Sequence, residues 1–466
     1  MMRKAYWYLM AYIKKHGVWL LTSFLFAVVV FAFLVPILVR LLVSKQREYI
    51  GYIGEYNLFN LPQEIKEQLS VGLTKVEPDG SVKPLLAERW VVEEDGKRYR
   101  FLIKKKVTWQ DGKELTPEDI RYNFSDVETV YTPGDVVFKL PDLFSPFPSV
   151  VSEPIFRQGV EKQWLFFTRP TLIGIGEYKV VDYEQVGQKL KELTVDGPNK
   201  RYIYRFYLTE GDALAAFKKG EIDRLDDLSS ADAVAGWPTI DIQHTLATDT
   251  YLAVFFNTDD PRLPKNVPQA LAYALDVDEA VRATSPINPT SWAYLDGGKV
   301  YRKDMARAIE RLLDGIPTQP LNLELTTTSL FISDAENYRQ SWEELGRQAV
   351  AACQAKKDAD QAQCQNLAIT INLKVSNFPD TTNYQLLLIG QVIPSDPDQY
   401  FLWHSGQPTN FTHYKNTRVD SLLEKGRQTL DQVERKAIYQ EFQQFLQEDP
   451  PAIFIRHLDR YSLLRK

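Results

Sequence analysis

The side chains in this sequence that could do chemistry are few and widely spaced. A zinc site needs three or four cysteine, histidine or acidic ligands at short spacing. The five histidines are scattered, and His404 and His413, the pair nearest in sequence, have no cysteine or closely spaced acid beside them. The adjacent acids at 93–94 and at 226–227 are typical of solvated loops, because carboxylates are rarely buried unless they are paired. We therefore predict no metal site and no acid–base pair.

The short motifs of the common enzyme classes are also missing from the sequence. It contains no GxxxxGK[ST] phosphate-binding loop, no HExxH zinc motif and no GxSxG nucleophile turn. Gly174 and Gly176 match only the first two glycines of a dinucleotide-binding fingerprint, and a loop or strand is the more common setting for such a pair. We predict no catalytic residue and no cofactor, which favours a binding protein over an enzyme.

Composition narrows the class of protein further. The chain has 466 residues, of which 44% are hydrophobic and 25% are charged, as in ordinary globular proteins. Its formal net charge of -6 argues against nucleic acid as a partner, because binding phosphates requires clustered lysine and arginine. Two cysteines are too few for a disulfide-dense scaffold. We expect a large, well-cored and mildly acidic body.

An uncharged run of 22 residues, 18–39, lies near the N-terminus. It is long enough to cross about 30 Å of hydrocarbon as a helix. Four basic residues and no acid precede it, which predicts a cytoplasmic N-terminus (1–17), a retained anchor (18–43) and an extracytoplasmic body. A cleaved signal peptide is the alternative, but the run ends in Leu-Val-Arg at 38–40 rather than in small residues. We expect a single-pass protein of the cell membrane that contacts the lipid bilayer through 18–39.

Two cysteines, Cys353 and Cys364, flank a polar loop between an expected helix (337–352) and an expected strand (367–375). An oxidising exterior favours a disulfide between them. Closing so short a loop would stabilise the fold by about 2–3 kcal/mol. The alternative is a pair of free, buried thiols.

Strand and helix patterns alternate through the rest of the chain. Strands are expected at 98–107, 204–208, 251–257 and 452–455. Helices are expected after the N-cap Thr116, at 213–219 between Asp212 and Gly220, at 269–275, and along the apolar stripe Val433, Ala437, Ile438, Phe442, Phe445 and Leu446. This alternation indicates α/β lobes rather than a helical bundle or a β-sandwich.

Several blocks of sequence, in order, resemble one known family. The first blocks lie at 72–75, 84–90, 95–101, 107–113 and 115–120, where they match a pattern of the form GL…P.LAesW…dDG..ytF.Lr..v.w.DGkp.TaeDv. Later blocks lie at 216–223, 256–258, 269–276 and 396–400. Across about 50–456 the chain is similar to the family 5 extracellular solute-binding proteins, the peptide- and nickel-binding components of ABC importers.

The resemblance implies a two-lobed α/β fold, periplasmic-binding-protein-like (type II), with an extra inserted domain and one preceding transmembrane helix. Lobe I would combine 48–69, 166–259 and 446–466, the inserted domain would span 70–165, and lobe II would span 260–445. A ligand would lie between the lobes, and hinge closure would bury it. The implied role is to pass a peptide or peptide-like ligand to an ABC permease. We expect a monomer.

The resemblance also implies a set of ligand contacts. In peptide-binding members the peptide lies extended, and its main chain bonds to strand edges. The strand expected at 386–393 stands where the family places such an edge, and Gly390 would let a ligand backbone approach closely. Positional correspondence gives the expected contacts Asn57, Leu58, Tyr251, Gly390, Gln391, Val392, Ile393, Asp396 and Trp403.

The sequence departs from the family pattern at one point. Peptide binders commonly hold the ligand's ammonium with an aspartate a few residues before Asp-Pro-Asp, but residues 392–395 contain no acid. Either Asp396 or Asp398 substitutes, or the ligand has no free N-terminus; alternatively, Asp396 caps a helix that begins near Gln399. A nickel chelate or an oligosaccharide is therefore an alternative ligand, and a transport-inactive envelope protein is an alternative role.

Overall fold

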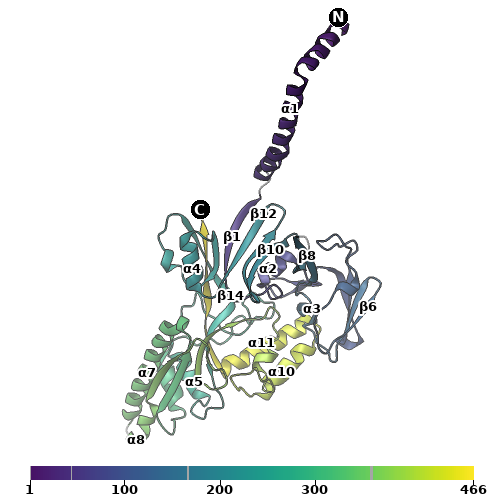
Figure 1. Cartoon of the computed structure of the whole chain (residues 1–466). Helices are drawn as coiled ribbons and strands as arrows, with labels where there is room; N and C mark the ends of the chain where they lie inside the picture. The colour runs from purple at the N-terminus through teal and green to yellow at the C-terminus, as the bar shows by residue number, and fades with distance from the viewer. Residues whose placement is uncertain (1, 43–44, 165–166, 357–359) are drawn as a thin grey trace.

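The computed structural model describes residues 2–42, 45–164, 167–356 and 360–466. Its largest element is a mixed sheet of ten strands in the order β10-β11-β12-β1-β13-β18-β14-β17-β15-β16 (Figure 1). The strands are β1 (Gln46–Ile53), β10 (Lys179–Val186), β11 (Lys189–Asp196), β12 (Lys200–Tyr207), β13 (Arg224–Leu228), β14 (Ile240–Phe256), β15 (Leu321–Thr327), β16 (Ile369–Val375), β17 (Leu386–Val392) and β18 (Ala452–Arg465).

Two long antiparallel strands, β14 and β18, connect the two ends of this sheet. The C-terminal part of β18 borders β13, and the C-terminal part of β14 borders β17. Midway along the pair, Ala247 is opposite Leu458 while Tyr251 is opposite His457, so that residues 248–250 bulge out of β14. A bulge bends a strand and increases its twist. This bulge, residues 248–250, divides the sheet into two lobes.

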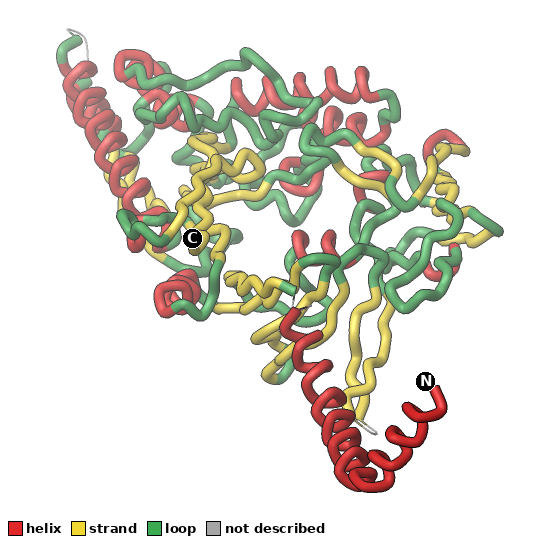
Figure 2. The backbone as a smooth tube through the Cα atoms, turned by 90° about the horizontal axis from the view of Figure 1, so that it is seen from above, coloured by secondary structure: helices red, strands yellow, loops and turns green. Residues whose placement is uncertain are grey.

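The first lobe contains β1 and β10 to β13, with the helices α2 (Gln63–Leu69) and α4 (Glu210–Lys219). A four-stranded sheet in the order β4-β5-β7-β6 adjoins it, and the β8–β9 hairpin extends outward (Figure 2). The bounds are β2 (Thr74–Val76), β3 (Val82–Pro84), β4 (Ala87–Glu93), β5 (Arg98–Ile103), β6 (Glu128–Thr132), β7 (Asp135–Lys139), α3 (Phe147–Val150), β8 (Arg157–Trp164) and β9 (Phe167–Ile173).

The second lobe contains β15 to β17 and most of the helices (Figure 1). Its helices are α5 (Asn266–Tyr273), α6 (Met305–Leu313), α7 (Ile332–Gln354), α8 (Gln361–Cys364), α9 (Tyr400–Trp403), α10 (Thr417–Gln428) and α11 (Gln432–Glu448). Cys353 near the end of α7 and Cys364 in α8 form the predicted disulfide, with their Cα atoms 5.6 Å apart.

Each lobe has its own hydrophobic core. The first lobe packs around Leu193 and Phe206, and the four-stranded sheet packs around Phe101. In the second lobe successive residues of β14 point to opposite faces of the sheet, so that Leu252 joins one cluster and Phe255 joins another. The bulge therefore lies between hydrophobic cores that belong to different lobes.

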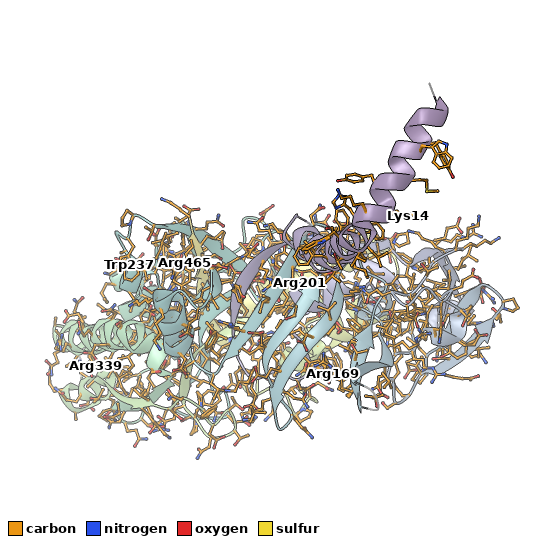
Figure 3. The ribbon with its side chains drawn as sticks, turned by 45° about the horizontal axis from the view of Figure 1, so that its top comes forward. Lys14, Arg169, Arg201, Trp237, Arg339 and Arg465 are labelled. Carbon is orange, nitrogen blue, oxygen red and sulfur yellow. A yellow bond between two sulfur atoms is a disulfide. The ribbon has the colours of Figure 1, made fainter. Side chains whose placement is uncertain are left out.

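The helix α1 (Met2–Leu42) projects away from this body, and Lys14 lies on the projecting part (Figure 3). Within it, the stretch Lys14–Phe31 is long and apolar enough to cross a membrane. The predicted run 18–39 is helical throughout, although its side chains from 32 onward lie outside the described part of the chain. Three residues, 43–45, separate α1 from β1.

Some local predictions needed correction. The helix expected at 213–219 begins at Glu210, because Thr209 rather than Asp212 is its N-cap; the Thr209 hydroxyl accepts the Asp212 N–H at 3.1 Å. The N-cap Thr116 is followed only by a 3₁₀ turn, Pro117–Asp119. The strand expected at 98–107 is shorter (β5), and Val433 of the expected apolar stripe is exposed in the first turn of α11.

Candidate functional site

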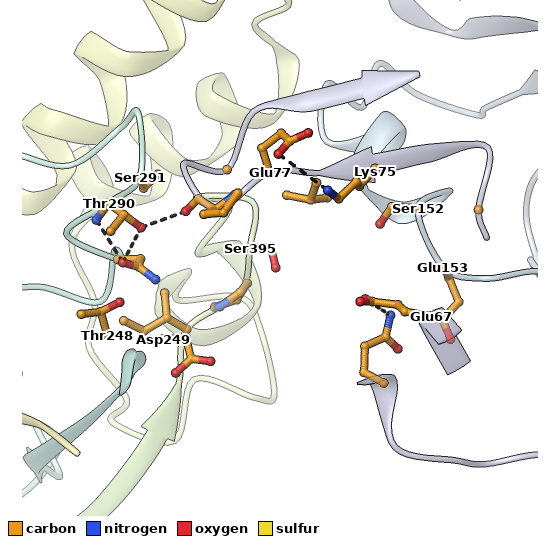
Figure 4. Close-up of a pocket in the computed structure, with 18 of the residues that line it drawn as sticks. Glu67, Lys75, Glu77, Ser152, Glu153, Thr248, Asp249, Thr290, Ser291 and Ser395 are labelled. Carbon is orange, nitrogen blue, oxygen red and sulfur yellow. Dashed lines mark hydrogen bonds and ion pairs between the residues drawn. The ribbon is translucent and has the colours of Figure 1, made fainter. Parts of the chain in front are cut away.

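A cavity of about 940 Å³ lies between the two lobes, beside the bulge of β14 (Figure 4). Its volume lies within the range of small-molecule sites, about 300–1,000 Å³. The first lobe lines it with residues of α2, the loop after α2, β2 and 152–154, and the second lobe lines it with Asn288, Thr290, Ser291 and 393–395. Residues 77, 78, 80 and 85 of the first lobe, residues 245–249 of β14 and Arg460 of β18 complete the lining.

The bulge places Thr248 and Asp249 in the cavity wall. The Ile393 N–H donates to the Asp249 carbonyl oxygen at 2.7 Å, which ties the bulge to the end of β17. The Asp249 carboxylate is 49% exposed and lies 3.1 Å from the Arg460 guanidinium. The bulge therefore presents a solvated carboxylate at the junction of the lobes.

A buried histidine supports the bulge from within the protein. The imidazole Nδ1–H of His457 donates to the Thr250 carbonyl oxygen at 3.1 Å. Burial lowers the pKa of His457, although this hydrogen bond and the Asp249 charge oppose the change. The bulge is thus packed against an imidazole that favours its neutral form.

The first-lobe wall carries charged side chains that are already engaged. Glu67 of α2 accepts a hydrogen bond from the Gln63 amide at 2.9 Å. Glu153 forms an ion pair with Lys66. Glu77 lies between two lysines, 3.8 Å from Lys75 and 3.6 Å from Lys83. These lysines are not free to bind a ligand carboxylate without giving up their present partners.

The second-lobe wall carries small neutral polar groups. The Asn288 carboxamide oxygen accepts the Thr290 N–H at 3.0 Å, which forms a tight turn. The Thr290 hydroxyl donates to the Pro78 carbonyl of the first lobe at 2.8 Å, so this turn also spans the cavity rim. Hydroxyl and amide groups at such a wall suit a polar ligand held through its main chain, because they form hydrogen bonds with neutral and charged ligands alike.

The described residues contain no group of three histidine, cysteine or acidic side chains able to hold a metal ion. The cavity instead combines hydroxyls, amides, main-chain groups and paired charges. These groups fit the reversible capture of a polar ligand by hydrogen bonds.

One of the nine predicted contacts, Ile393, lines this cavity. Gln391 and Val392 line a smaller pocket of about 230 Å³ that shares Pro394 with the main cavity. Gly390 faces protein, because a Cβ placed on it would lie 3.1 Å from a methyl carbon of Leu458. The strand edge predicted to meet the ligand therefore reaches the cavity at its C-terminal end.

Three other predicted contacts are buried in hydrophobic clusters. Leu58 packs in the first-lobe core, beside Asn57, which lies outside the cavity lining. Tyr251 and Trp403 both pack against the Phe454 ring, and Trp403 is 0% exposed. Among the described residues, neither the Tyr251 hydroxyl nor the Trp403 indole N–H has a hydrogen-bond partner. Their roles as ligand contacts remain predictions.

The aspartates of the Asp-Pro-Asp segment are held in buried ion pairs. Asp396 accepts two hydrogen bonds from the Arg435 guanidinium, at 2.9 and 2.6 Å. Asp398 lies 2.8 Å from the Nε of Arg427, and it rather than Asp396 accepts the Tyr400 N–H at the start of α9. The cap expected of Asp396 is therefore wrong: the N-cap of α9 is Gln399, which makes no side-chain cap bond, and Asp396 accepts the Asp398 N–H instead.

Burial changes the pKa of one group in each of the two ion pairs, Asp398 in one and Arg435 in the other. Burial raises the pKa of Asp398, although the Arg427 guanidinium opposes the change. For Arg435, burial disfavours the charged form, but the Asp396 carboxylate outweighs it and raises the pKa of the guanidinium. These carboxylates are occupied by the protein's own cations.

Sequence analysis missed most of the lining, including Glu67, Thr248, Asp249, Thr290 and Arg460. No spacing rule links these residues, because they come from separate elements. One usable signal was the polar stretch at 248–250, which interrupts a long strand pattern just before the buried strand at 251–257.

Comparison with known proteins gives a consistent result. A family model described as bacterial extracellular solute-binding proteins, family 5 Middle, matches residues 81–413. Among relatives, the oligopeptide-binding protein AppA of Bacillus subtilis is 24% identical over 89% of this chain and 87% of its own length. The peptide transport periplasmic protein SapA of Salmonella typhimurium is also 24% identical, over 86% and 84%.

Solved structures share the fold. NikZ from Campylobacter jejuni, in complex with Ni(L-His), aligns with a TM-score of 0.69 at 22% identity, covering 91% of this chain and 94% of its own. AppA from Bacillus subtilis, in complex with a nonapeptide, aligns with a TM-score of 0.60 at 19% identity, covering 91% and 95%.

Proposed function

Because this chain belongs to the bacterial extracellular solute-binding proteins, family 5, we propose that it captures peptides between its lobes and delivers them to an ABC permease. The relatives named for oligopeptide binding and peptide transport support a peptide as the ligand. The cavity between the lobes is the single observation that carries the proposal, since it lies beside the strand bulge about which the lobes can rotate.

The proposal assigns the ligand's main chain to the neutral wall. Thr290 and Ser291 of the second lobe, with the main chain at 393–395, would bond an extended peptide. Gln391 and Val392 would meet a ligand side chain in the smaller pocket. Asn57, Leu58, Tyr251, Gly390, Asp396 and Trp403 are retained as candidate contacts in a rearranged state.

The ligand's ammonium needs a carboxylate, and the buried ion pairs of Asp396 and Asp398 make them poor partners. Asp249 is the better candidate, because its side chain is half exposed at the cavity and its carbonyl already bonds the end of β17. A charge-assisted hydrogen bond of this kind contributes about 1.5–3 kcal/mol.

The placement of the protein in the cell belongs to the same proposal. We assign α1 as a single-pass anchor, with 1–17 in the cytoplasm and the body outside. The apolar stretch Lys14–Phe31, whose helix projects from the body, supports this assignment. Extraction of membranes with alkaline carbonate tests it: an anchored chain stays with the membrane, and release of the intact chain would contradict the anchor.

The predicted domain boundaries are kept as part of the proposal. Lobe I would be 48–69, 166–259 and 446–466, the inserted domain 70–165, and lobe II 260–445. The separate clusters of the four-stranded sheet and of the first lobe support the division near its N-terminal end, whereas 251–256 and 452–455 pack into the clusters of the second lobe. The protein would act as a monomer.

The most direct test is native mass spectrometry of the full chain in detergent, followed by competition. We expect a co-purified mass that matches a peptide, and thermal stabilisation by a mixture of random tripeptides. A nickel–histidine complex and an oligosaccharide mixture are the competing arms. Stabilisation by either of these, with none by peptides, would contradict the proposal.

A further inference from the structure

A second set of contacts joins the lobes at a distance from the cavity lining. It consists of Phe144 and Ser145, which follow β7 on the first-lobe side, and Gly426 and Arg427 of α10 in the second lobe. We call these four residues the clasp. Gly426, Arg427, Phe144 and Ser145 do not contribute to the cavity wall described above, so they lie outside the cavity proposed for the ligand. Phe144 and Arg427 instead line a second cavity of about 510 Å³ between the same lobes.

The clasp is built around one guanidinium. Arg427 stacks on Tyr400 and Phe401 of its own lobe, with its central carbon 4.1 and 4.6 Å from the ring centroids. The Phe144 ring of the other lobe lies 5.1 Å from the same carbon. A cation between aromatic rings is held by their negative faces, and most strongly where water is excluded.

Two hydrogen bonds reinforce this stacking. The Ser145 N–H donates to the Arg427 carbonyl oxygen at 2.7 Å, and the Ser145 hydroxyl donates to the Gly426 carbonyl oxygen at 3.1 Å. Both acceptors are carbonyls at the C-terminal end of α10, whose last four carbonyls lack partners within the helix. The clasp therefore satisfies groups of the second lobe with donors of the first.

Each half of the clasp is fixed to its own lobe. On the first-lobe side, the Gln110 amide donates to the carbonyls of Leu69 and Tyr178, at 2.9 and 2.6 Å, which ties the four-stranded sheet to the lobe. On the second-lobe side, Asp398 holds the Arg427 Nε at 2.8 Å. A rotation about the bulge must consequently separate Phe144 from Arg427.

A second contact between the lobes lies near the clasp, because the Trp292 ring lies 5.5 Å from the central carbon of Arg435, whose Nε–H donates to the Gly426 carbonyl. The Trp292 N–H donates to the Asp79 carbonyl at 2.9 Å, and its indole N–H donates to the Gly80 carbonyl at 3.2 Å. The lobes are thus joined at the clasp and at Trp292 as well as at the bulge. Opening the cavity breaks the clasp and the Trp292 contacts together.

We infer that the clasp sets the equilibrium between open and closed lobes, and that Phe144 and Arg427 are positioning residues that tune ligand affinity without touching the ligand. If only the closed state binds tightly, the apparent dissociation constant rises in proportion as the closed fraction falls. The inference about closure stands by itself, whereas its effect on affinity rests on the proposed function.

Hydrogen exchange of the full chain in detergent, without ligand, tests closure directly. The Ser145 and Trp292 amides are protected only by carbonyls of the other lobe, whereas the Gly176 amide bonds to Leu69 within one lobe. We expect Phe144→Leu and Arg427→Lys to speed exchange at Ser145 and Trp292 about tenfold, and to leave Gly176 unchanged.

Matched controls separate the clasp from general destabilisation. Phe156→Leu alters a half-buried phenylalanine that packs against the first-lobe core and lines neither of the two cavities between the lobes. Arg418→Lys alters an arginine of the same helix that pairs with Glu441 within the second lobe. Neither control should change exchange at Ser145 or Trp292. Equal exchange in all four variants would overturn the inference.

A second measurement uses a mixture of random tripeptides as the probe. We expect the two clasp variants to weaken binding about tenfold through faster dissociation, with association and the controls unchanged. If wild type binds none of these peptides while the exchange differences persist, the peptide proposal fails and the clasp stands. If binding is unchanged while exchange accelerates, closure does not control affinity, and the inference falls.

Discussion

Two stretches of chain meet at Ile393, and they differ in how deeply their carboxylates are buried and in whether they match a sequence motif. The acidic loop, residues 394–398, carries the Asp-Pro-Asp motif, and its carboxylates are buried against Arg435 and Arg427. The bulge, residues 248–250, matches no motif, and its carboxylate is half exposed at the cavity. The comparison teaches that the conspicuous acids hold the wall in place, while an irregularity in a strand supplies groups that face the cavity.

The largest expected effect breaks the anchor of the acidic loop. Arg435 is 8% exposed on its side chain, so Arg435→Ala leaves the Asp396 carboxylate buried without its partner. We expect a loss of about 3–5 kcal/mol in the free energy of unfolding, measured by denaturant titration of the full chain in detergent. The control Arg418→Ala removes an exposed pair and should cost at most about 1 kcal/mol. Equal losses in the two variants would show that the buried pair of Arg435 and Asp396 contributes no more to stability than the exposed pair of Arg418 and Glu441.

The next change asks whether Asp396 has a structural role or a ligand-binding role. Asp396→Asn keeps an acceptor for Arg435 but removes the charge, which should cost about 2 kcal/mol of stability. Peptide affinity of the folded variant should stay within about twofold of wild type. Loss of peptide binding with unchanged stability would contradict this and would show that Asp396 contacts the ligand.

Sequence analysis could predict what depends on neighbours along the chain. The strand expected at 251–257 matches the end of β14 up to Phe256, and the helix expected at 269–275 overlaps α5, because apolar periodicity is local. The N-cap of α4 was misplaced because Thr209 and Asp212 are both common N-cap residues, and only the structure shows that the Thr209 hydroxyl accepts the Asp212 N–H. Boundaries of this kind depend on a single hydrogen bond.

The site was much less predictable. The bulge exists because β14 and β18, which are far apart in the sequence, pair in two registers, with Ala247 opposite Leu458 and Tyr251 opposite His457. A local pattern does not contain that information. The resemblance to a family directed attention to 386–398, which does reach the cavity at Ile393, but it could not reveal that Arg435 already occupies Asp396.

Asp249→Asn tests the bulge in the same way as Asp396→Asn tests the acidic loop. The pair with Arg460 is solvated, so stability should change by less than about 1 kcal/mol. Binding of peptides with a free N-terminus should weaken about tenfold, as expected for one charge-assisted hydrogen bond. Isothermal titration with free and N-acetylated peptides measures this, and an equal loss for both kinds of peptide would exclude an ammonium partner.

The smallest effect concerns the histidine beneath the bulge. Burial lowers the pKa of His457 below its ordinary value of 6.5. Just below pH 6.5 this histidine is therefore protonated in the unfolded chain but neutral in the folded chain. Stability should therefore be unaffected above that pH and should fall as the pH decreases below it. His457→Gln should flatten this slope in thermal unfolding between pH 7.5 and 5.5. A slope that persists would assign the acid sensitivity to other groups.

The short connection between α1 and β1 has a consequence for how the protein meets its transporter. From Leu42 to Gln46 the chain has four Cα–Cα steps, which extend to about 14 Å at most. With α1 in a bilayer, so short a connection keeps the body close to the lipid surface. Diffusion to a membrane-embedded partner is then confined to two dimensions, at a high effective concentration. Lengthening the connection with glycine and serine should slow transport of the ligand without altering the affinity for it.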